Sequence, residues 1–261
     1  MKYVDGHIHL PIFKNNADWI IKKSRRFGVR HLVSVSTNYD NSEKNVKMCS
    51  KYDNVSAFVG THPFCFGSPY TDGAPGLNVK WLYREIHEME KLAPKADGIG
   101  EVGIDHYLIP NLNTQKRKEQ QYLFSKMCEI AEENDKPMIV HCLDSAGSVY
   151  NILEEYNVNP VVIHSFRGTK QLLDRGLKNG YYFSVMPKNN KLDFYPDVDM
   201  VVDRAPIDRI LVESDAPRKD GKIFDSRTVP QIVKEIATRR NLSFKKTAWE
   251  IYDTSKKVFN V

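Results

Sequence analysis

Short apolar runs rich in valine and isoleucine recur along the whole chain, and each is followed by a segment long enough for a helix. Such runs, bounded by glycine, proline or asparagine, predict buried β-strands. Eight runs are present, and the first begins at Tyr3. The other seven predicted strands cover residues 31–36, 55–60, 98–104, 137–142, 161–164, 181–185 and 209–214. This regular alternation constrains the fold more than any other property of the chain.

The segments between the strands carry apolar residues at helical spacing. Leu82, Ile86 and Met89, for example, fall on one face of a helix. Another helix is predicted to end at Gly28, because glycine is common just beyond a helix C-terminus. The predicted helices cover residues 17–27, 42–51, 115–134, 230–239 and 243–259, with further helices around 82–93, 149–156 and 172–177.

This pattern favours a (β/α)8 barrel, the TIM-barrel fold, formed as a single domain over residues 1–261. No linker rich in serine or glycine and no low-complexity tract divides the chain. An open, doubly wound parallel sheet is the competing architecture. That alternative would not readily bring the first and eighth strands together.

Composition predicts an ordinary soluble protein of the cytoplasm. The 261 residues carry a net charge of +5, which permits a polyanionic partner without requiring one. The four cysteines form no CxxC pair, and no signal peptide precedes the first strand, so we expect reduced thiols. No apolar run is long enough to cross a membrane, which predicts no membrane association.

Side chains that can bind a metal ion stand at the ends of six of the eight predicted strands. In a barrel of this kind, the C-terminal strand ends meet around the active site. Five of the eight histidines in the chain lie there, which is hard to explain as five unrelated structural histidines. The side chains are His7 and His9 on strand one, His62, Glu101, His141, His164 and Asp215. The sequence therefore predicts a metal site.

The number of ligands predicts two divalent ions. Four histidines and two carboxylates exceed the three or four protein ligands of a single catalytic zinc. Two ions at about 3.5–4 Å need a bridging group, and a carboxylate suits that role. Two divalent ions, two carboxylates and one hydroxide leave a charge of about +1, which favours an anionic substrate oxygen. Imidazole and carboxylate together suit Zn, Mn, Fe or Co, and Mg less well.

Six short motifs resemble those of the TatD family, a group of metal-dependent deoxyribonucleases within the amidohydrolase-like barrels. The resemblance extends from about Tyr3 to Phe259, with the motifs in the expected order. The motifs are Asp-Gly-His-Ile-His, Thr-His-Pro, Gly-Glu-Val-Gly-Ile-Asp, Ile-Val-His, His-Ser-Phe-Arg-Gly and Glu-Ser-Asp-Ala-Pro. The resemblance implies a (β/α)8 metallohydrolase that cleaves DNA, with single strands or chain ends expected rather than a duplex interior.

Carried over residue by residue, the resemblance implies the metal ligands. One ion would be bound by His7, His9, Glu101 and Asp215. The other would be bound by Glu101, His141 and His164, so that Glu101 bridges the two.

The resemblance also implies roles for other residues near the ions. His62 would contact or orient the substrate phosphate, and Asp215 could serve as the base for the attacking water. Together with Glu101, these two residues are the predicted catalytic groups. Asp5 is expected to orient a histidine from outside the ligand set. Asp105 is expected to be structural, through the loop that it begins.

The chain departs from the family pattern where the substrate would bind. Leu143 stands where the family usually has an arginine, and no matching asparagine follows the Asp-Ala-Pro segment. Arg167, Lys188 or Arg218 could replace the missing phosphate contact, and we predict Arg167 and Arg218, with His62, as substrate-binding residues. The aromatic residues near the mouth could stack on unpaired bases or simply pack the loops; they are Phe64, Phe66, Tyr70 and Tyr107.

Two other functional classes remain open. A related barrel hydrolase would act on a small amide, lactone or phosphoester, and many such enzymes carry a modified lysine on strand four. Here Glu101 stands on that strand with no lysine nearby. A barrel used only for binding is the second alternative, and the intact set of metal-capable side chains argues against it.

Overall fold

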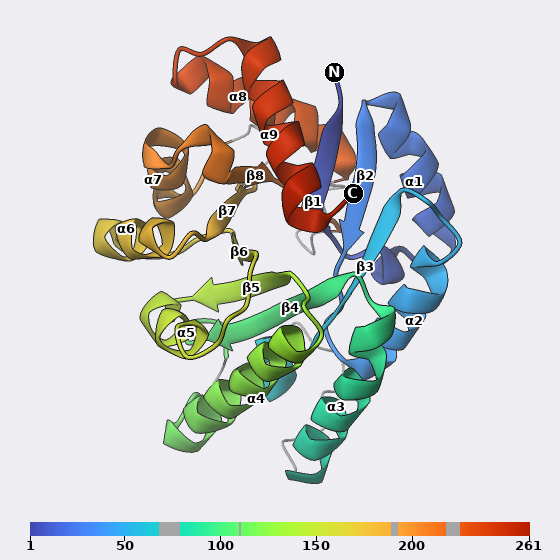
Figure 1. The fold of residues 1–261 in the computed structure, drawn as a ribbon, viewed down its shortest axis with the longest axis vertical. Coiled ribbons are helices and arrows are strands. Elements are labelled where there is room, and N and C mark those ends of the chain that lie inside the picture. Colours follow the sequence, from blue (N-terminus) through green and yellow to red (C-terminus); the bar gives the residue numbers. More distant parts are fainter. Residues whose placement is uncertain (68–78, 110, 189–192, 218–224) are drawn as a thin grey trace.

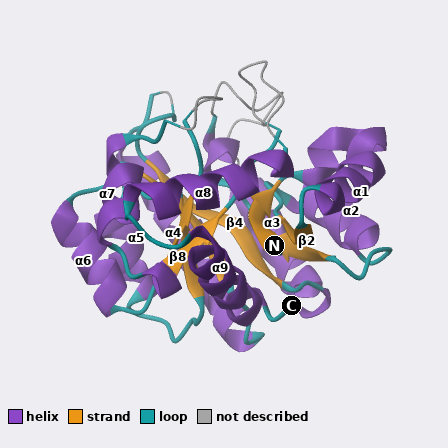
Figure 2. Cartoon of the chain, turned by 90° about the horizontal axis from the view of Figure 1, so that it is seen from above, coloured by secondary structure: helices purple, strands orange, loops and turns teal. Residues whose placement is uncertain are grey.

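Eight parallel strands form one sheet in the computed structural model, which describes residues 1–67, 79–109, 111–188, 193–217 and 225–261. Each strand pairs with the next one in the sequence, so their order around the sheet is β1 to β8. Figure 1 shows the strands arranged as a ring, and Figure 2 shows the helices packed around it. The predicted (β/α)8 barrel is confirmed.

The strands and helices alternate with the predicted period. The strands are β1 Tyr3–Ile8, β2 Val29–Ser34, β3 Val55–Val59, β4 Gly98–Asp105, β5 Met138–Leu143, β6 Val161–His164, β7 Tyr182–Val185 and β8 Ile210–Val212. The helices are α1 Ala17–Arg26, α2 Tyr39–Cys49, α3 Val79–Leu92, α4 Thr114–Glu133, α5 Ala146–Leu153, α6 Lys170–Lys178, α7 Pro196–Arg204, α8 Val229–Arg239 and α9 Phe244–Phe259. Short 3₁₀ helices cover Leu10–Asn16, Pro63–Phe66, Ala93–Lys95, Ile207–Arg209 and Ser226–Thr228.

Helix α7 was not predicted, and β8 is shorter than expected. Pro196 occupies the first turn of α7, where its missing N–H costs nothing, and the helix buries Val198, Val201 and Val202. Three aspartates and an arginine stand among the apolar residues of this nine-residue helix, which weakens its periodicity. β8 ends at Val212, and Glu213 follows the strand, with its backbone N–H still donating to the Val185 carbonyl at 3.1 Å.

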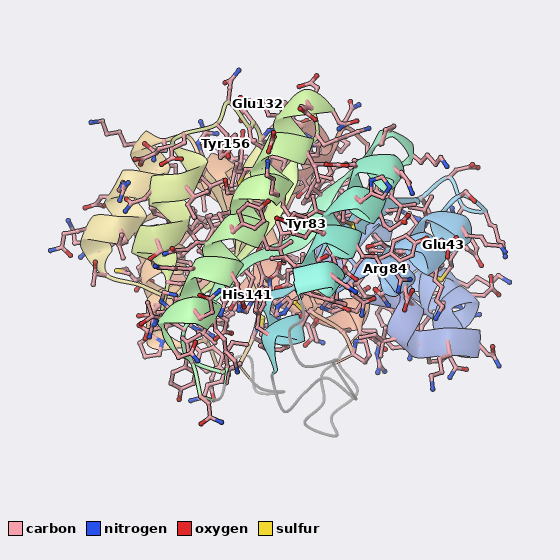
Figure 3. All side chains as sticks on the ribbon, turned by 90° about the horizontal axis from the view of Figure 1, so that it is seen from below. Glu43, Tyr83, Arg84, Glu132, His141 and Tyr156 are labelled. Carbon is pink, nitrogen blue, oxygen red and sulfur yellow. The ribbon has the colours of Figure 1, made fainter. Side chains whose placement is uncertain are left out.

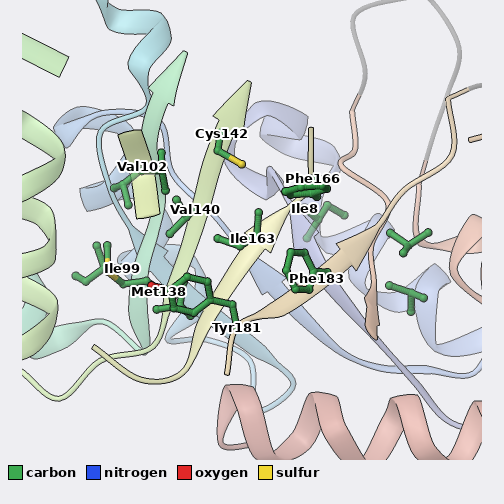
Figure 4. Close-up of a cluster of buried hydrophobic side chains, with 14 of the residues drawn as sticks. Ile8, Ile99, Val102, Met138, Val140, Cys142, Ile163, Phe166, Tyr181 and Phe183 are labelled. Atoms are coloured by element: carbon green, nitrogen blue, oxygen red, sulfur yellow. The ribbon is translucent and has the colours of Figure 1, made fainter. Parts of the chain in front are cut away.

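Two hydrophobic clusters lie on opposite sides of the sheet. The larger one fills the space between the strands and the outer helices and includes Val140, Ile163 and Phe183, which lie on three neighbouring strands in Figure 4. The smaller one fills the barrel interior, since its strand residues alternate with those of the first cluster. Its members are Val4, Val33, Val35, Phe58, Ile139, Val162, Leu211, Val258 and Phe259. Helix α9 therefore supplies apolar side chains to the interior.

The barrel closes where β1 meets the segment that follows β8. The Asp215 backbone N–H donates to the His7 carbonyl at 2.9 Å, and the His9 N–H donates to the Ala216 carbonyl at 2.7 Å. Ile8 forms a parallel bridge with Ala216. Because these residues flank or include predicted ligands, closure of the barrel also assembles one side of the predicted site. No helix among the described residues is both long and apolar enough to span a bilayer.

Gly103 on β4 is required by the close approach of β5. Its φ is +148°, and a Cβ atom there would lie 1.9 Å from the His141 carbonyl oxygen. We expect Gly103→Ala to reduce the free energy of unfolding by about 2–4 kcal/mol, because backbone must move on both strands. Gly147→Ala is the control, since its Cβ would meet only Leu172, at 4.0 Å. Chemical denaturation would measure both, and equal stability of the two variants would contradict the argument.

His31 on β2 should make the fold sensitive to acid independently of any bound metal. Burial lowers the pKa of His31 to about 4, while Asp97 raises it slightly, and its Nε2 lies 2.8 Å from Ser56 Oγ. The unfolded chain protonates this imidazole near pH 6.5, so its contribution is intact above that pH and is lost as the pH falls toward 4.

We expect His31→Gln to lose less stability than the unsubstituted protein between pH 7 and pH 4, by roughly 2–3 kcal/mol. Denaturant titrations with chelator present would measure this, since both proteins then carry the same metal-free site. Parallel pH profiles for the two proteins would show that His31 is not responsible.

Candidate metal centre

The alternation of side chains along the strands places polar groups directly above the apolar interior. Ile139, Val162 and Leu211 belong to the interior cluster, and the residues two positions later face the same way. Those residues are His141, His164 and Glu213, all of them buried. Figure 3 shows His141 at the opposite end of the barrel from Glu132, which lies near the C-terminus of α4.

Glu101 lies at the centre of this polar layer, and one of its oxygens faces the residues of strand one. Oε2 lies 3.3 Å from His7 Nε2 and 3.6 Å from His9 Nε2. Asp215 Oδ1 completes the group at 3.5 Å and 3.4 Å from the same two nitrogens. Four potential ligand atoms therefore converge on one point.

The other oxygen of Glu101 faces a second group of histidines. Oε1 lies 3.0 Å from His141 Nδ1, 3.2 Å from His62 Nε2 and 3.9 Å from His164 Nε2. The carboxylate thus stands between two sets of nitrogens, with one oxygen directed at each. This is the arrangement expected of a group that bridges two cations.

The second group brings lone pairs face to face, which indicates that it is built for a cation. His141 Nε2 lies 2.9 Å from Asp105 Oδ2, so its proton resides on Nε2 and donates to that carboxylate. The lone pair on His141 Nδ1 then faces the Glu101 oxygen at 3.0 Å. Two acceptors at this distance repel each other unless a proton or a metal ion lies between them.

His62 differs from the other histidines because its proton faces the site. The Phe64 backbone N–H donates to His62 Nδ1 at 3.0 Å, which leaves the proton of the neutral ring on Nε2. Burial lowers the pKa of His62 to about 4, so the ring is neutral near pH 7. Its Nε2–H is a hydrogen-bond donor rather than a lone pair, which suits an anionic oxygen better than a metal ion.

The buried carboxylates make the site attractive to positive charge. Burial raises the pKa of Glu101, but His62, His7 and His164 outweigh it and hold that pKa well below its usual value. The Asp215 pKa is lowered in the same way, chiefly by His9 and His164. Burial lowers the pKa of His164, yet Glu213 and Glu101 reverse this and raise it to about 10. The carboxylates that favour a proton on His164 would equally favour a divalent cation.

All six predicted ligands lie together in the structure, as does His62. Among the described residues, three groupings have ligand atoms close enough for an ion: His7, His9 and Glu101; His62, Glu101 and His141; and His7, His164 and Glu213. Arg167 lines the same cavity, whereas Arg218 lies outside the described residues.

Glu213 is the residue of this centre that the sequence analysis missed. It is fully buried, and Oε1 lies 2.6 Å from His164 Nδ1. Its position in the sequence could have indicated this role, since a glutamate that directly follows the apolar run Ile210–Val212 is expected to be buried and to need a partner. Glu213 belongs to the same Glu-Ser-Asp-Ala-Pro motif as Asp215, but the resemblance implied a metal ligand only for Asp215.

The expected role of Asp5 needs correction, whereas Asp105 has a second role beside the expected one. Asp5 does not orient a histidine: its carboxylate accepts from the Ser214 N–H at 2.8 Å and the Ser226 hydroxyl at 2.6 Å, which fastens the segment after β8. Burial raises the pKa of Asp5 to about 7. Asp105 does shape its loop, because Oδ1 accepts from the Tyr107 N–H at 2.8 Å, but its other oxygen also contacts His141.

A cavity of about 1260 Å³ opens above these residues. Arg167 lies on its wall with its guanidinium 3.7 Å from the centre of the Tyr195 ring, and the Lys188 ammonium lies 5.4 Å from the same ring. Phe64 packs edge-on against His62 with ring centres 4.2 Å apart. Tyr107 is 72% exposed.

Of the two remaining aromatic candidates, only Phe66 lies within the described residues. Phe66 is buried in the hydrophobic core, where it packs against Trp81. Tyr70 lies outside the described residues. Among the described residues, Phe64 and Tyr107 line the cavity as candidates for stacking on a base, and Tyr195 joins them from the segment before α7.

Comparison with known proteins agrees with the motifs. The family model described as TatD related DNase matches residues 4–260. The chain belongs to the TatD family. This confirms the resemblance inferred from the six motifs, and it covers the whole barrel.

Relatives of this TatD-family chain are distant but extend over most of it. It is 26% identical over 217 residues to the human protein named deoxyribonuclease TATDN3, covering 82% of this chain and 77% of the relative. It is 24% identical over 270 residues to an uncharacterized metal-dependent hydrolase of Bacillus subtilis, YabD, covering 98% of each. The crystal structure of YJJV, a TatD homolog from Escherichia coli K12, superposes with a TM-score of 0.82 at 19% identity, covering 99% of this chain and 98% of the other.

Proposed function

We propose that this protein is a metal-dependent deoxyribonuclease that hydrolyses phosphodiester bonds with two divalent ions. The observation that carries the proposal is the position of Glu101, whose two oxygens face two separate sets of side chains. Family membership supports a hydrolase of the TatD type, and a relative named as a deoxyribonuclease supports DNA as the substrate.

The ligand atoms follow from the distances within each set. His7 Nε2, His9 Nε2, Glu101 Oε2 and Asp215 Oδ1 would hold one ion. Glu101 Oε1, His141 Nδ1 and His164 Nε2 would hold the other. This mixture of imidazole and carboxylate suits Zn or Mn better than Mg, which prefers a shell made of oxygen.

Bound divalent ions would lower the pKa of a water molecule and offset negative charge on the phosphate. In the reaction, the water oxygen bonds to phosphorus, the bond from phosphorus to one sugar oxygen breaks, and that oxygen gains a proton. Asp215 is the base that takes the proton of the water, since its side chain is 23% exposed to the cavity and its lowered pKa keeps it ionised. His62 donates its Nε2–H to a phosphate oxygen.

The shape of the cavity favours a polymer over a small substrate. Its volume of about 1260 Å³ exceeds the roughly 300–1,000 Å³ of most small-molecule sites. Arg167, held against Tyr195, presents a cation at the wall and would contact a phosphate away from the cleaved bond. Phe64 and Tyr107 offer faces for unpaired bases, which favours single strands or chain ends as substrates.

Cleavage of defined, end-labelled oligonucleotides would test this function. We expect single-stranded DNA to be cut when Mn²⁺ or Zn²⁺ is supplied and to remain intact with a chelator. A parallel panel of small esters, lactones and cyclic amides tests the alternative barrel hydrolase. Turnover of that panel without cleavage of any oligonucleotide would refute the nuclease proposal.

We further propose that the protein works in a reducing compartment such as the cytoplasm. All four cysteines are free thiols, and Cys49, Cys128 and Cys142 are buried. Burial raises the pKa of Cys49 and Cys142 to about 12, so neither forms a reactive thiolate near neutral pH.

A further inference from the structure

Glu213 lies beneath the two proposed ion sites and contacts a histidine of each. Its side chain is fully buried, and Oε1 lies 2.6 Å from His164 Nδ1. The ring N–H of His164 is not aligned with this oxygen, so the pair forms a close electrostatic contact rather than a linear hydrogen bond. Oε2 lies 3.9 Å from His7 Nδ1.

One carboxylate can serve both histidines because their rings lie side by side. The ring centres of His7 and His164 are 4.2 Å apart, and the ring planes differ by 30°. Their Nδ1 atoms therefore point the same way, toward Glu213, while their Nε2 atoms point to opposite oxygens of Glu101. His7 Nδ1 is buried and has no hydrogen-bond partner within the described part of the chain.

His7, His164 and Glu213 also form a grouping with the dimensions of a metal site, but the chemistry of the rings excludes this use. A neutral imidazole has one lone pair and one N–H. If Nε2 of each ring binds an ion at the proposed ion sites, Nδ1 must carry the proton. Glu213 then faces two N–H donors, which a carboxylate can accept with its two oxygens.

We propose that Glu213 is a positioning residue shared by both metal sites. It holds the ring proton of His7 and of His164 on Nδ1, so that the Nε2 lone pair of each ring faces its proposed ion site. This inference rests on the proposed two-ion function. His141 is positioned separately, by Asp105. The three ligand histidines His7, His141 and His164 therefore depend on two carboxylates.

A comparison of Glu213→Gln with Asp105→Asn tests the shared role. A glutamine offers one neutral acceptor oxygen and an NH₂ in place of two charged oxygens, so one histidine loses its acceptor and the other keeps only an uncharged, weaker one. We expect Glu213→Gln to weaken the binding of both ions by about 10–100-fold, and Asp105→Asn to weaken one of them by that factor. Calorimetric titration of metal-free protein with Zn²⁺ or Mn²⁺ measures this without any assay of activity.

The outcomes separate the inference from the function on which it rests. Unchanged affinity in Glu213→Gln, or weakening at only one site, would overturn the shared role. If the unsubstituted protein binds no ion at all, the two-ion function itself fails.

Nuclear magnetic resonance of ¹⁵N-histidine in the unsubstituted, metal-loaded protein provides a second test that requires no variant. We expect protonated Nδ1 in His7 and His164, and protonated Nε2 in His62 and His141. Protonated Nε2 in either His7 or His164 would exclude Glu213 as the group that positions them.

Discussion

Glu101→Gln is expected to abolish both the binding of two ions and the cleavage of DNA. A carboxylate can direct one charged oxygen at each group of histidines, whereas an amide offers a single acceptor and an NH₂ that repels a cation. We expect kcat/KM to fall at least about 10³-fold, since the electrostatic stabilisation of the phosphate depends on the ions. Cleavage of end-labelled single strands and metal analysis of the purified variant would measure the two effects.

Glu85→Gln is the matched control for this change. Glu85 is also buried at the wall of the cavity, but it accepts from the Thr61 hydroxyl at 2.8 Å and the Tyr39 N–H at 2.9 Å. It therefore stabilises loops without contacting either group of histidines. We expect this variant to bind both ions and retain activity within a few-fold. Metal-stimulated cleavage that survives in Glu101→Gln would refute the bridge.

Asp215→Asn is expected to lower kcat strongly while leaving KM nearly unchanged. The amide oxygen can still lie near His7 and His9, but it cannot accept the proton of the attacking water. Proton transfer to a positioned base contributes roughly 10²–10⁴-fold, so we expect a loss of about 10³-fold in kcat. The ion held by His141 and His164 should remain bound, because Asp215 contacts neither of these ligand atoms in the second set.

Asp197→Asn separates this effect from a general loss of negative charge. Asp197 also lines the cavity, in the first turn of α7, and belongs to neither ion site. We expect its substitution to change kcat less than about three-fold, as is usual for a surface change. Steady-state kinetics on one oligonucleotide at saturating Mn²⁺ would compare the variants. An equal loss in both would mean that charge, rather than proton transfer, is what Asp215 supplies.

The position of each ligand along the chain could be predicted because it depends on local pattern. A β-strand presents alternate residues to one face, so His141 and His164 follow Ile139 and Val162 inward once the strand boundaries are known. The parallel arrangement then places all C-terminal strand ends at one end of the barrel. Periodicity and spacing alone were sufficient to predict the fold and the seven side chains, His62 among them, that meet at the strand ends; the family resemblance implied which six of them are ligands.

The roles of the polar residues around the ligands could not be predicted, because partners distant in sequence determine them. Asp5 binds Ser214 and Ser226, more than two hundred positions away, and no local pattern distinguishes that role from orienting a histidine. Glu213 acquires its role from His7, which reaches it only when the barrel closes. Strand pairing between distant segments decides such contacts.

The sequence by itself determined the alternating fold and which side chains gather at the strand ends, since both follow from the two-residue repeat of a strand and the spacing of the helices. Only the tertiary structure decided which ring nitrogen of His141 and of His62 carries the proton, because neighbouring groups place it: Asp105 for His141 and the Phe64 backbone for His62. It also decided that Glu101 stands between two groups, since this requires residues of four other strand ends to meet within about 4 Å of its oxygens.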